Sequence, residues 1–271
     1  MSHIILVGAG NMGFAMLRKW ATLETHRFSV VEPNEVLRKR ASDLGIDTYA
    51  SRDGMPAGLR ADVLVVATKP PMVGDVIEGY AESLEPDGLV ISVAAGVSID
   101  DMASRACRPV AIIRAMPNTP ASIGEGMIVC CSNPVASTPA HRRLAEQLLA
   151  VVGRAAFIDD EAKMDAVTAV SGSGPAYVFH FIEGLVQAAV EAGLDEDLAL
   201  VLAKQTVFGA AKLANESSDP PSVLREQVTS PNGTTEVALN CLMAEERGLR
   251  SLLSHAVQAA KRRSKELGRT L

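Results

Sequence analysis

The chain has 271 residues, more than one typical compact domain needs and enough for two. Its hydrophobic content of 48% and charged content of 21% are those of an ordinary globular protein, and its net charge of −6 argues against nucleic-acid binding. No apolar run reaches the roughly 20 residues that span a bilayer, and the four cysteines lack metal-ligand spacing. The sequence therefore predicts a soluble, cytoplasmic protein without a metal site.

The first half of the chain alternates short apolar runs with amphipathic stretches. The predicted strands cover residues 3–8, 27–32, 61–68, 88–95, 109–118, 125–132 and 154–159, and the predicted helices cover 11–23, 34–45, 71–84 and 139–153. Alternation at this spacing requires crossover connections and a mainly parallel sheet with helices on both faces. We therefore predict an α/β fold, with a Rossmann-type, doubly wound N-terminal domain at residues 1–160.

The second half of the chain shows helical periods and no convincing strand. The predicted helices cover residues 161–172, 175–194, 195–217, 221–230 and 233–268. A domain of this size buries a limited core alone, yet these helices are Ala-rich and apolar. We expect an all-α C-terminal domain at residues 161–271 that forms a homodimer. The basic run Lys261–Lys265 is interpreted as the solvated end of the last helix.

A glycine-rich turn follows the first predicted strand and opens the first predicted helix. Gly8, Gly10 and Gly13 have the G-x-G-x-x-G spacing, with Asn11 and Met12 between them. The glycines allow a tight turn, close approach of the backbone to a pyrophosphate and close helix–strand packing, while the helix N-terminus attracts the anion. This context predicts a dinucleotide-binding site.

The residue at the end of the second predicted strand bears on which dinucleotide binds. Glu32 lies about 20 residues beyond the glycine turn, where a carboxylate hydrogen-bonds a ribose 2′-hydroxyl and repels a 2′-phosphate. This favours NADH over NADPH. Two alternatives stay open: Glu32 caps a turn with Pro33, or the nearby cations Arg38, Lys39 and Arg40 hold the phosphate of NADPH.

The start of the second half resembles hydroxyacid dehydrogenases of the 6-phosphogluconate type, but without their catalytic lysine. Gly172 and Gly174 match the glycines of that pattern, whereas Val178 stands at the lysine position. Oxidation of an alcohol needs a group that takes the hydroxyl proton. The absence of such a group at Val178 favours an imine substrate, because a protonated C=N bond accepts hydride directly.

The segment TSPNGTTEVA, residues 229–238, is predicted to be a turn that leads into a helix. Asn232 and Gly233 make the turn, Thr234 or Thr235 lies near the cap, and an acid occupies the first helical turn. Free backbone N–H groups and the hydroxyls of Ser230, Thr234 and Thr235 would form an uncharged anion pocket, which suits a carboxylate. The alternative is an ordinary capped helix.

Together, the motifs resemble those of pyrroline-5-carboxylate reductases. LVGAGNMG, ATKP, SVAAGVS, RAMPNTPA, SGSGPAYVF, TSPNGTT and GLRSLLSHAV follow one another in the family's order over essentially the whole chain. The resemblance implies hydride transfer from NADH or NADPH to the imine of 1-pyrroline-5-carboxylate, giving L-proline in the last step of proline biosynthesis. It also implies pairing through the helical domain, with dimers often assembled into larger rings.

The resemblance further implies roles for individual residues. The cofactor would be held by the glycine turn and by three later segments, Ala67, Thr68, Lys69 and Pro70, then Ala95, then Met116, Pro117 and Asn118. The substrate carboxylate would be bound by Ser230, Asn232, Gly233, Thr234 and Thr235. Ser230 and Thr235 would be the catalytic residues, with the Thr235 hydroxyl near the ring nitrogen.

Three positions depart from the usual family pattern. Asn232 replaces a glycine, Asp219 stands where a histidine is common, and Thr68 adds a hydroxyl where valine is common. Two other functions fit the same features: a reductase of another cyclic imine acid, and a non-catalytic dinucleotide sensor that binds a partner protein.

Overall fold

The chain folds into two compact units in the computed structural model, which describes residues 1–269. The Rossmann unit comprises Met1–Ser173 and the residues from Ala260 onward, and the helical unit comprises Gly174–Ala259. The sequence places the division between residues 160 and 161, where strands give way to helices. The compact units divide the chain elsewhere, because the turns after residue 160 pack on the Rossmann core and bond the end of the last helix.

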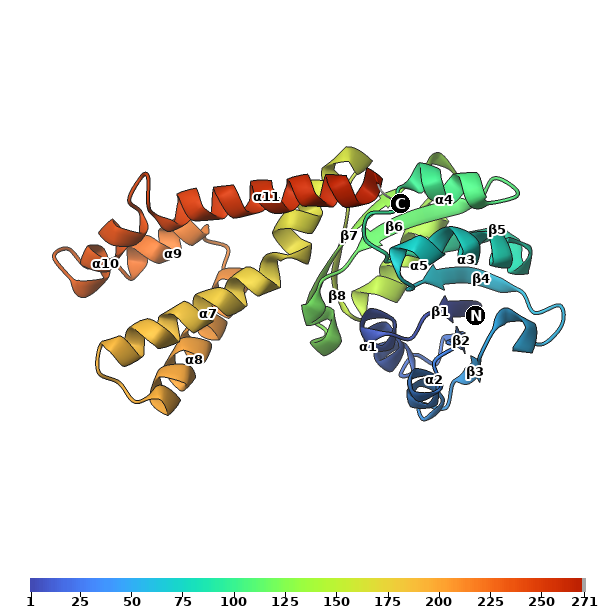
Figure 1. The fold of residues 1–271 in the computed structure, drawn as a ribbon, viewed down its shortest axis with the longest axis horizontal. Coiled ribbons are helices and arrows are strands. Elements are labelled where there is room, and N and C mark those ends of the chain that lie inside the picture. Colours follow the sequence, from blue (N-terminus) through green and yellow to red (C-terminus); the bar gives the residue numbers. More distant parts are fainter. Residues whose placement is uncertain (270–271) are drawn as a thin grey trace. The chain divides into compact units, whose positions relative to one another are not determined.

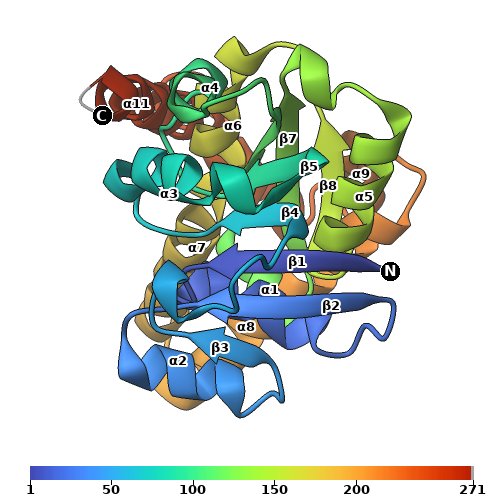
Figure 2. The ribbon, with the colours of Figure 1, turned by 90° about the vertical axis from the view of Figure 1, so that its right-hand side faces the viewer.

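An eight-stranded sheet forms the centre of the Rossmann unit, in the spatial order β3-β2-β1-β4-β5-β6-β7-β8. Figure 2 shows β3, β2, β1, β4 and β5 stacked in this order. Neighbouring strands are parallel except β6 and β7, as expected for a mainly parallel sheet. The strands are β1 (Ser2–Val7), β2 (His26–Val31), β3 (Asp47–Tyr49), β4 (Ala61–Val66), β5 (Leu84–Ser92), β6 (Ala111–Met116), β7 (Gly126–Ser132) and β8 (Gly153–Phe157).

The strand order reverses between β1 and β4, since β2 and β3 lie on one side of β1 and the later strands on the other. Val7 at the end of β1 pairs with Val31 of β2 and with Val66 of β4, so these three strands end side by side. Ligands of open α/β sheets bind outside the carboxyl ends of the strands at such a reversal. The glycine turn, Glu32 and Ala67 all follow directly at this place.

Two hydrophobic clusters cover the two faces of the sheet. Ile4 and Leu6 of β1 belong to one cluster and Ile5 and Val7 to the other, as the alternation of side chains along a strand requires. The first cluster includes residues of α1 (Asn11–Trp20), α2 (Glu35–Ser42) and α5 (Pro139–Ala150). The second includes residues of α3 (Val73–Tyr80), α4 (Ile99–Arg105) and α6 (Met164–Val167). The predicted doubly wound arrangement is therefore confirmed.

Trp20 anchors α1 to the first of these clusters. Its side chain is fully buried, its ring stacks on Phe28 with 5.5 Å between centroids, and its indole N–H donates a hydrogen bond of 2.7 Å to the carbonyl of Leu148. A buried indole needs a partner for its N–H, and a carbonyl of α5 supplies it. The helix that begins at the glycine turn is thus fixed at its far end.

The helical unit contains α7 (Gly174–Glu191), α8 (Glu196–Glu216), α9 (Pro221–Gln227), α10 (Thr234–Leu242) and the first part of α11 (Leu249–Arg269). Figure 1 shows α7 and α8 paired side by side. The prediction of one helix over residues 233–268 is wrong, because the chain turns between Leu242 and Leu249. A Cβ atom at Gly248 would lie 2.3 Å from the carbonyl oxygen of Ala244, so this tight turn requires glycine.

The helical unit buries almost none of its apolar side chains. Within Gly174–Ala259, all of which the structure describes, the buried apolar residues are Ala199 and Ala203. Large side chains such as Phe179, Phe208 and Leu252 are about 60% exposed. Among residues 1–269, no helix combines the length and the apolar character needed to cross a membrane.

Candidate active site

The glycine turn has a different constraint at each glycine. Gly8 has φ = 95°, a left-handed conformation that favours glycine. A Cβ atom at Gly13 would lie 2.1 Å from the carbonyl oxygen of Gly8, so the third glycine allows α1 to pack against the turn. A Cβ atom at Gly10 would meet nothing within 4 Å. Gly10 therefore leaves space at the turn, where a pyrophosphate can approach the backbone.

The N-terminus of α1 presents uncapped backbone N–H groups. Gly10 is the N-cap residue and supplies no side-chain acceptor, and the first turn carries no acidic residue. Asn11 is exposed and Met12 partly buried at this end of the helix. The first N–H groups of a helix have no intrahelical partner and carry partial positive charge. The residues present therefore fit the pyrophosphate of a dinucleotide.

Glu32 connects the end of β2 to the glycine turn. Its side chain is buried, and its two carboxylate oxygens accept hydrogen bonds from the backbone N–H groups of Ala9 at 2.7 Å and Asn34 at 2.9 Å. The Arg38 guanidinium donates to the carbonyl oxygens of Glu32 and Pro33. A negative charge and a cation thus flank the place where a Rossmann domain binds the adenosine ribose.

The loops after β4 and β5 provide the next predicted cofactor residues. The N–H of Ala67 donates to the carbonyl of Val7 at 2.8 Å, which fixes the chain of the Ala67–Pro70 loop against the glycine turn. Lys69 is exposed, and Ala95, in the loop after β5, is also exposed. The structure therefore brings these residues to the same edge of the sheet as the glycine turn.

An ion pair that the sequence analysis missed supports the loop after β5. Arg114 on β6 is nearly buried, and its guanidinium donates a hydrogen bond of 2.8 Å to Glu161 Oε1. The same oxygen accepts the N–H of Ile99, the first residue of α4, at 2.9 Å. Glu161 thereby joins β6 to the end of the loop that contains Ala95. The sequence contains both residues but gives no signal of their pairing, since they lie far apart along the chain.

Met116, the last residue of β6, and Asn118, two residues further on, lie against a π-helical turn at Thr168–Gly172. The Asn118 amide donates to the carbonyl of Ser171 at 3.2 Å, and its oxygen accepts the N–H of Met127 at 2.8 Å. A Cβ atom at Gly172 would lie 2.7 Å from Met116 Cε. The Asn118 side chain thus holds two backbone segments together, and its contact with a nicotinamide stays a prediction.

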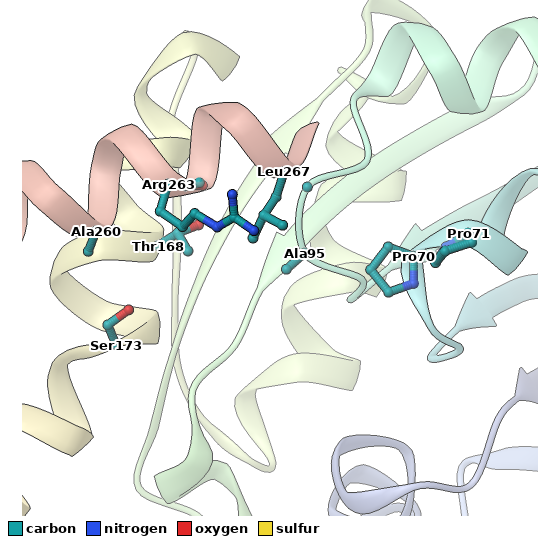
Figure 3. Close-up of a pocket in the computed structure, with 10 residues that line it drawn as sticks. Pro70, Pro71, Ala95, Thr168, Ser173, Ala260, Arg263 and Leu267 are labelled. Atoms are coloured by element: carbon teal, nitrogen blue, oxygen red, sulfur yellow. The ribbon is translucent and has the colours of Figure 1, made fainter. Parts of the chain in front are cut away.

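A pocket of about 500 Å³ opens beside these loops in the Rossmann unit. Figure 3 shows Arg263 and Leu267 extending from α11 toward the loop that carries Ala95. Arg263 also forms an ion pair with Glu266 at 3.0 Å. Because Arg263 lines the pocket, the basic run of the last helix contributes to a pocket wall, which the sequence analysis did not predict. The lining residues are Pro70, Pro71, Ala95, Gly96, Thr168, Ser173, Ala260, Arg263, Ser264 and Leu267.

In the helical unit, the predicted turn before α10 is present. Asn232 has φ = 57°, a left-handed conformation that asparagine tolerates, and Gly233 is the N-cap residue of a helix that begins at Thr234. The N–H of Asn232 donates to Glu236 Oε2 at 2.7 Å, so the acid of the first turn closes the loop. No side chain caps the helix. The first backbone N–H groups of α10 are therefore available to an anion.

Cys130, Tyr80 and His180 lie outside the segments described above. Burial raises the pKa of the Cys130 thiol to about 12 and that of the Tyr80 hydroxyl to about 12, so both stay protonated at neutral pH. His180 is exposed on α7, where it contacts Glu183 at 3.0 Å. The arrangement therefore offers binding and orientation by amides and hydroxyls.

Comparison with known proteins shows which families and relatives the chain resembles. Residues 161–267 match the family described as pyrroline-5-carboxylate reductase dimerisation, and residues 3–96 match the one described as NADP oxidoreductase coenzyme F420-dependent. The chain is 38% identical to a pyrroline-5-carboxylate reductase of Pseudomonas aeruginosa, over 99% of this chain and 98% of that protein. It is also 38% identical to one of Pisum sativum, over 96% and 94% of the two chains.

Solved structures show the same likeness in three dimensions. A pyrroline-5-carboxylate reductase of Coxiella burnetii matches with a TM-score of 0.91 and 35% identity, over 98% of both chains. A pyrroline carboxylate reductase of Plasmodium falciparum, with NADP bound, matches with a TM-score of 0.81 and 28% identity, over 98% of both chains. With the glycine turn and the helix-start turn described above, these matches show that the chain belongs to the pyrroline-5-carboxylate reductase family.

Proposed function

We propose that this protein reduces 1-pyrroline-5-carboxylate to L-proline with a reduced nicotinamide dinucleotide. The observation that carries the proposal is the uncapped start of α10, which offers backbone N–H groups and hydroxyls to a carboxylate without any cationic side chain of its own. A second anion site of this kind complements the glycine turn, which fits the pyrophosphate of the cofactor. A non-catalytic sensor would have no use for it.

In the Rossmann unit, the residues at the sheet edge would bind and orient the cofactor. The glycine turn and the first N–H groups of α1 bind the pyrophosphate, and the Ala67–Pro70 loop lines the ribose and phosphate path. Ala95 and the segment Met116–Asn118 orient the nicotinamide. When bound, the reduced cofactor supplies the hydride. The protein raises the rate mainly by holding the reacting groups in position.

In the helical unit, the turn before α10 would bind the substrate. Ser230, Gly233 and Thr234 would hold the carboxylate and so fix the orientation of the imine. The Thr235 hydroxyl would lie near the ring nitrogen, where that hydroxyl or a water from solvent would supply the one proton that the nitrogen gains when hydride adds to a neutral C=N bond. Asn232 tightens the turn through its N–H bond to Glu236, and the N–H of Gly233 donates to the carbonyl of Ser230 at 3.0 Å, so the N–H groups of Thr234 and Thr235 would bind the substrate.

Steady-state kinetics with 1-pyrroline-5-carboxylate and each reduced cofactor test the reaction. We expect oxidation of the cofactor that depends on the imine and yields one proline for each cofactor consumed. Turnover confined to a different cyclic imine acid would replace the substrate assignment. Cofactor binding without turnover on 1-pyrroline-5-carboxylate or any other cyclic imine acid would favour a non-catalytic dinucleotide sensor.

Substitution of Thr235 tests the proposed carboxylate site. Thr235→Ala should raise KM for the imine and lower kcat, because the hydroxyl contacts the substrate in both ground and transition states. Thr229→Ala is the matched control, since the Thr229 hydroxyl already donates to the carbonyl of Arg225 at 2.6 Å. Unchanged kinetics for Thr235→Ala would remove this residue from the site.

We further propose that the enzyme prefers NADH to NADPH. The buried Glu32 carboxylate is held beside the glycine turn by Ala9 and Asn34, where its charge would repel a 2′-phosphate. Glu32→Gln should shift the ratio of kcat/KM for NADH over NADPH toward NADPH by about tenfold. The ratio is informative because a general loss of structure would lower kcat/KM for NADH and for NADPH together. A wild-type enzyme that strongly prefers NADPH would contradict the proposal and would favour Arg38 or Arg40 as the phosphate ligand.

The proposed assembly is a homodimer formed through the helical unit. Its support is the large exposed apolar surface of α7 and α8, together with the match to a dimerisation family. A helix that is apolar on several faces is stable when those faces are buried. Sedimentation of the full chain at micromolar concentration should give at least twice the mass of one chain, and a larger ring would give a higher even multiple.

A further inference from the structure

A second pocket of the Rossmann unit, of about 350 Å³, lies along α1. Its walls come from α1, from α2 and from a short 3₁₀ helix that follows β6. The lining residues are Asn11, Met12, Phe14, Ala15, Arg18, Arg40, Thr119 and Ser122. Two of these are arginines, three others carry an amide or a hydroxyl group, and none is acidic. The pocket is therefore positively charged and rich in hydrogen-bond donors, although the chain as a whole is acidic.

Helix geometry brings these polar side chains to one place. Asn11 and Arg18 stand seven positions apart, which is close to two helical turns, so they share one face of α1. Thr119 and Ser122 stand three apart in the 3₁₀ helix, where side chains at this spacing are aligned. Ala121 between them is fully buried in the first hydrophobic cluster. Both walls thus rest on the core of the Rossmann unit, so the pocket is preformed.

The two arginines of the pocket have no carboxylate partner among residues 1–269. Arg40 lies instead over the ring of Phe14, with 4.0 Å between its guanidinium carbon and the ring centroid. This contact orients the guanidinium and leaves its N–H groups without an acceptor. The helix α1, which carries Arg18, contains no acidic residue that could neutralise the pocket. The donors of both arginines are therefore available to a ligand.

We propose that this pocket binds the phosphate group of a small ligand, at a site separate from that of the dinucleotide. Two guanidinium groups match the charge and the several oxygen atoms of a phosphate, and the amide and hydroxyl groups supply further donors. The volume lies in the range of pockets that hold small organic molecules, about 300–1,000 Å³. Free phosphate would occupy the arginine end alone, whereas a phosphate ester would also place its carbon atoms against Met12 and Ala15.

The arginine end of the pocket is distant from the place proposed for the cofactor pyrophosphate. The pyrophosphate belongs at the start of α1, and Arg18 lies about 10 Å further along the helix axis. Two anions at this separation repel each other only weakly at physiological ionic strength. A phosphate and the dinucleotide can therefore bind together. The inference goes beyond the proposed function, since phosphate binding requires neither hydride transfer nor the imine.

Calorimetric titration of the full chain, saturated with NADH in about 0.15 M salt, tests the site. The probes are inorganic phosphate, ribose 5-phosphate and unphosphorylated ribose. We expect phosphate to bind with a Kd of about 1 mM and ribose not to bind. Arg18→Gln and Arg40→Gln should each weaken phosphate binding at least tenfold, because each removes a charged donor. Tighter binding of ribose 5-phosphate would identify the ligand as a phosphate ester, and equal binding would identify it as free phosphate.

Two further variants separate a built site from general attraction to surface charge. Arg143→Gln alters an exposed arginine of α5 that does not line the pocket, and it should bind phosphate as the wild type does. Ser122→Leu keeps the charge but fills part of the pocket, so it should weaken binding at least tenfold. An equal loss in Arg143→Gln, or wild-type affinity in Ser122→Leu, would overturn the proposal.

Saturation with NADPH in place of NADH tests whether the pocket belongs to the cofactor. Phosphate binding that persists with NADH but disappears with NADPH would assign the pocket to the 2′-phosphate and would contradict a separate site. Absence of phosphate binding in the wild type would also reject the proposal. If the wild type binds neither dinucleotide, the proposed function fails, and the same titrations of the unsaturated chain still decide the role of the two arginines.

Discussion

The two units of this chain bury their apolar residues to very different extents. The Rossmann unit packs both faces of its sheet under helices, and Trp20, Ile4 and Leu89 have essentially no exposed surface. The helical unit is equally rich in apolar residues, yet Phe208 is 62% exposed and Val201 63%. The Rossmann unit thus completes its core within one chain, whereas the helical unit leaves a large apolar surface exposed, as the proposed homodimer would require.

This difference also separates the two halves of the proposed chemistry. The proposed cofactor residues lie at the edge of the sheet, where Gly13 packs against Gly8 and the Glu32 carboxylate accepts a hydrogen bond from the N–H of Ala9. The substrate turn precedes a short helix in the unit that lacks a core. We therefore expect substitutions at the glycine turn to act on cofactor affinity, and substitutions on the exposed apolar surface of the helical unit to act through assembly.

The largest expected effect comes from placing a charge on the exposed apolar surface of the helical unit. Phe208→Glu should convert the assembly to monomers at micromolar concentration and abolish activity, because a buried unpaired carboxylate is strongly unfavourable at an interface. Analytical ultracentrifugation and imine-dependent cofactor oxidation measure the two results.

Val36→Glu is the matched control in the Rossmann unit. Val36 on α2 is 70% exposed, which is more than Phe208, but it lies in a unit with a complete core. This variant should keep the wild-type mass and activity. Loss of assembly in both variants, or in neither, would break the comparison between the units.

The next largest effect is expected at the glycine turn. Gly10→Val should reduce NADH affinity at least 100-fold while the melting temperature stays near that of wild type, because the space at Gly10 is open in the protein itself. Gly13→Val should lose both binding and stability, since its side chain would collide with the carbonyl of Gly8. Both variants should still assemble through the helical unit. A stable Gly13→Val variant with wild-type affinity would contradict the described packing.

An intermediate effect is expected for the partly buried ion pair of the Rossmann unit. Glu161→Gln keeps an acceptor for the N–H of Ile99 but leaves the Arg114 charge without its partner, which should lower the free energy of unfolding by about 2 kcal/mol. Urea denaturation measures the change. Glu78→Gln breaks an exposed contact with Arg105 and should cost less than about 0.5 kcal/mol. Equal losses of unfolding free energy in the two variants would show that burial does not determine how much these ion pairs stabilise the protein.

The smallest effect concerns pH. Burial, and then the charge of the N-terminal amino group, lower the pKa of His26 from its ordinary value of 6.5, against the opposing charge of Asp62. The unfolded chain therefore binds the proton more readily than the folded one. The stabilising contribution is complete above pH 6.5 and is lost as the pH falls through the folded pKa.

Urea midpoints of wild type and His26→Asn across that pH range test this effect. The variant should show a flatter dependence on pH than wild type. His180→Asn changes an exposed histidine of the helical unit and serves as the control. A wild-type pH dependence in His26→Asn would assign the effect to another group.

Much of the fold follows from local patterns in the sequence. The apolar runs before Gly8, Glu32 and Ala67 became strands, because buried parallel strands need continuous apolar segments. The start of α10 at Thr234 was predictable from the turn residues before it. The strand β3 and the helix α4 were missed, since the first has three residues and the second seven, too few to establish a period.

The site was predictable as a set of segments but not as a set of contacts. The sequence places Glu32 and Asn118 near the cofactor, but it does not show that Ala9 and Asn34 bond one carboxylate or that Ser171 bonds one amide. These bonds join residues that only the tertiary fold brings together. Residues that act through distant contacts therefore need the structure to be recognised.

Trp20, the single tryptophan of the chain, has a consequence for how this protein can be observed. Its emission reports the packing between α1 and α5, whereas circular dichroism reports the helices of both units, including α7, α8 and α10. Thermal curves recorded with the two methods should coincide only if both units melt together. Comparing tryptophan emission with circular dichroism therefore shows whether the helical unit unfolds before the sheet of the Rossmann unit.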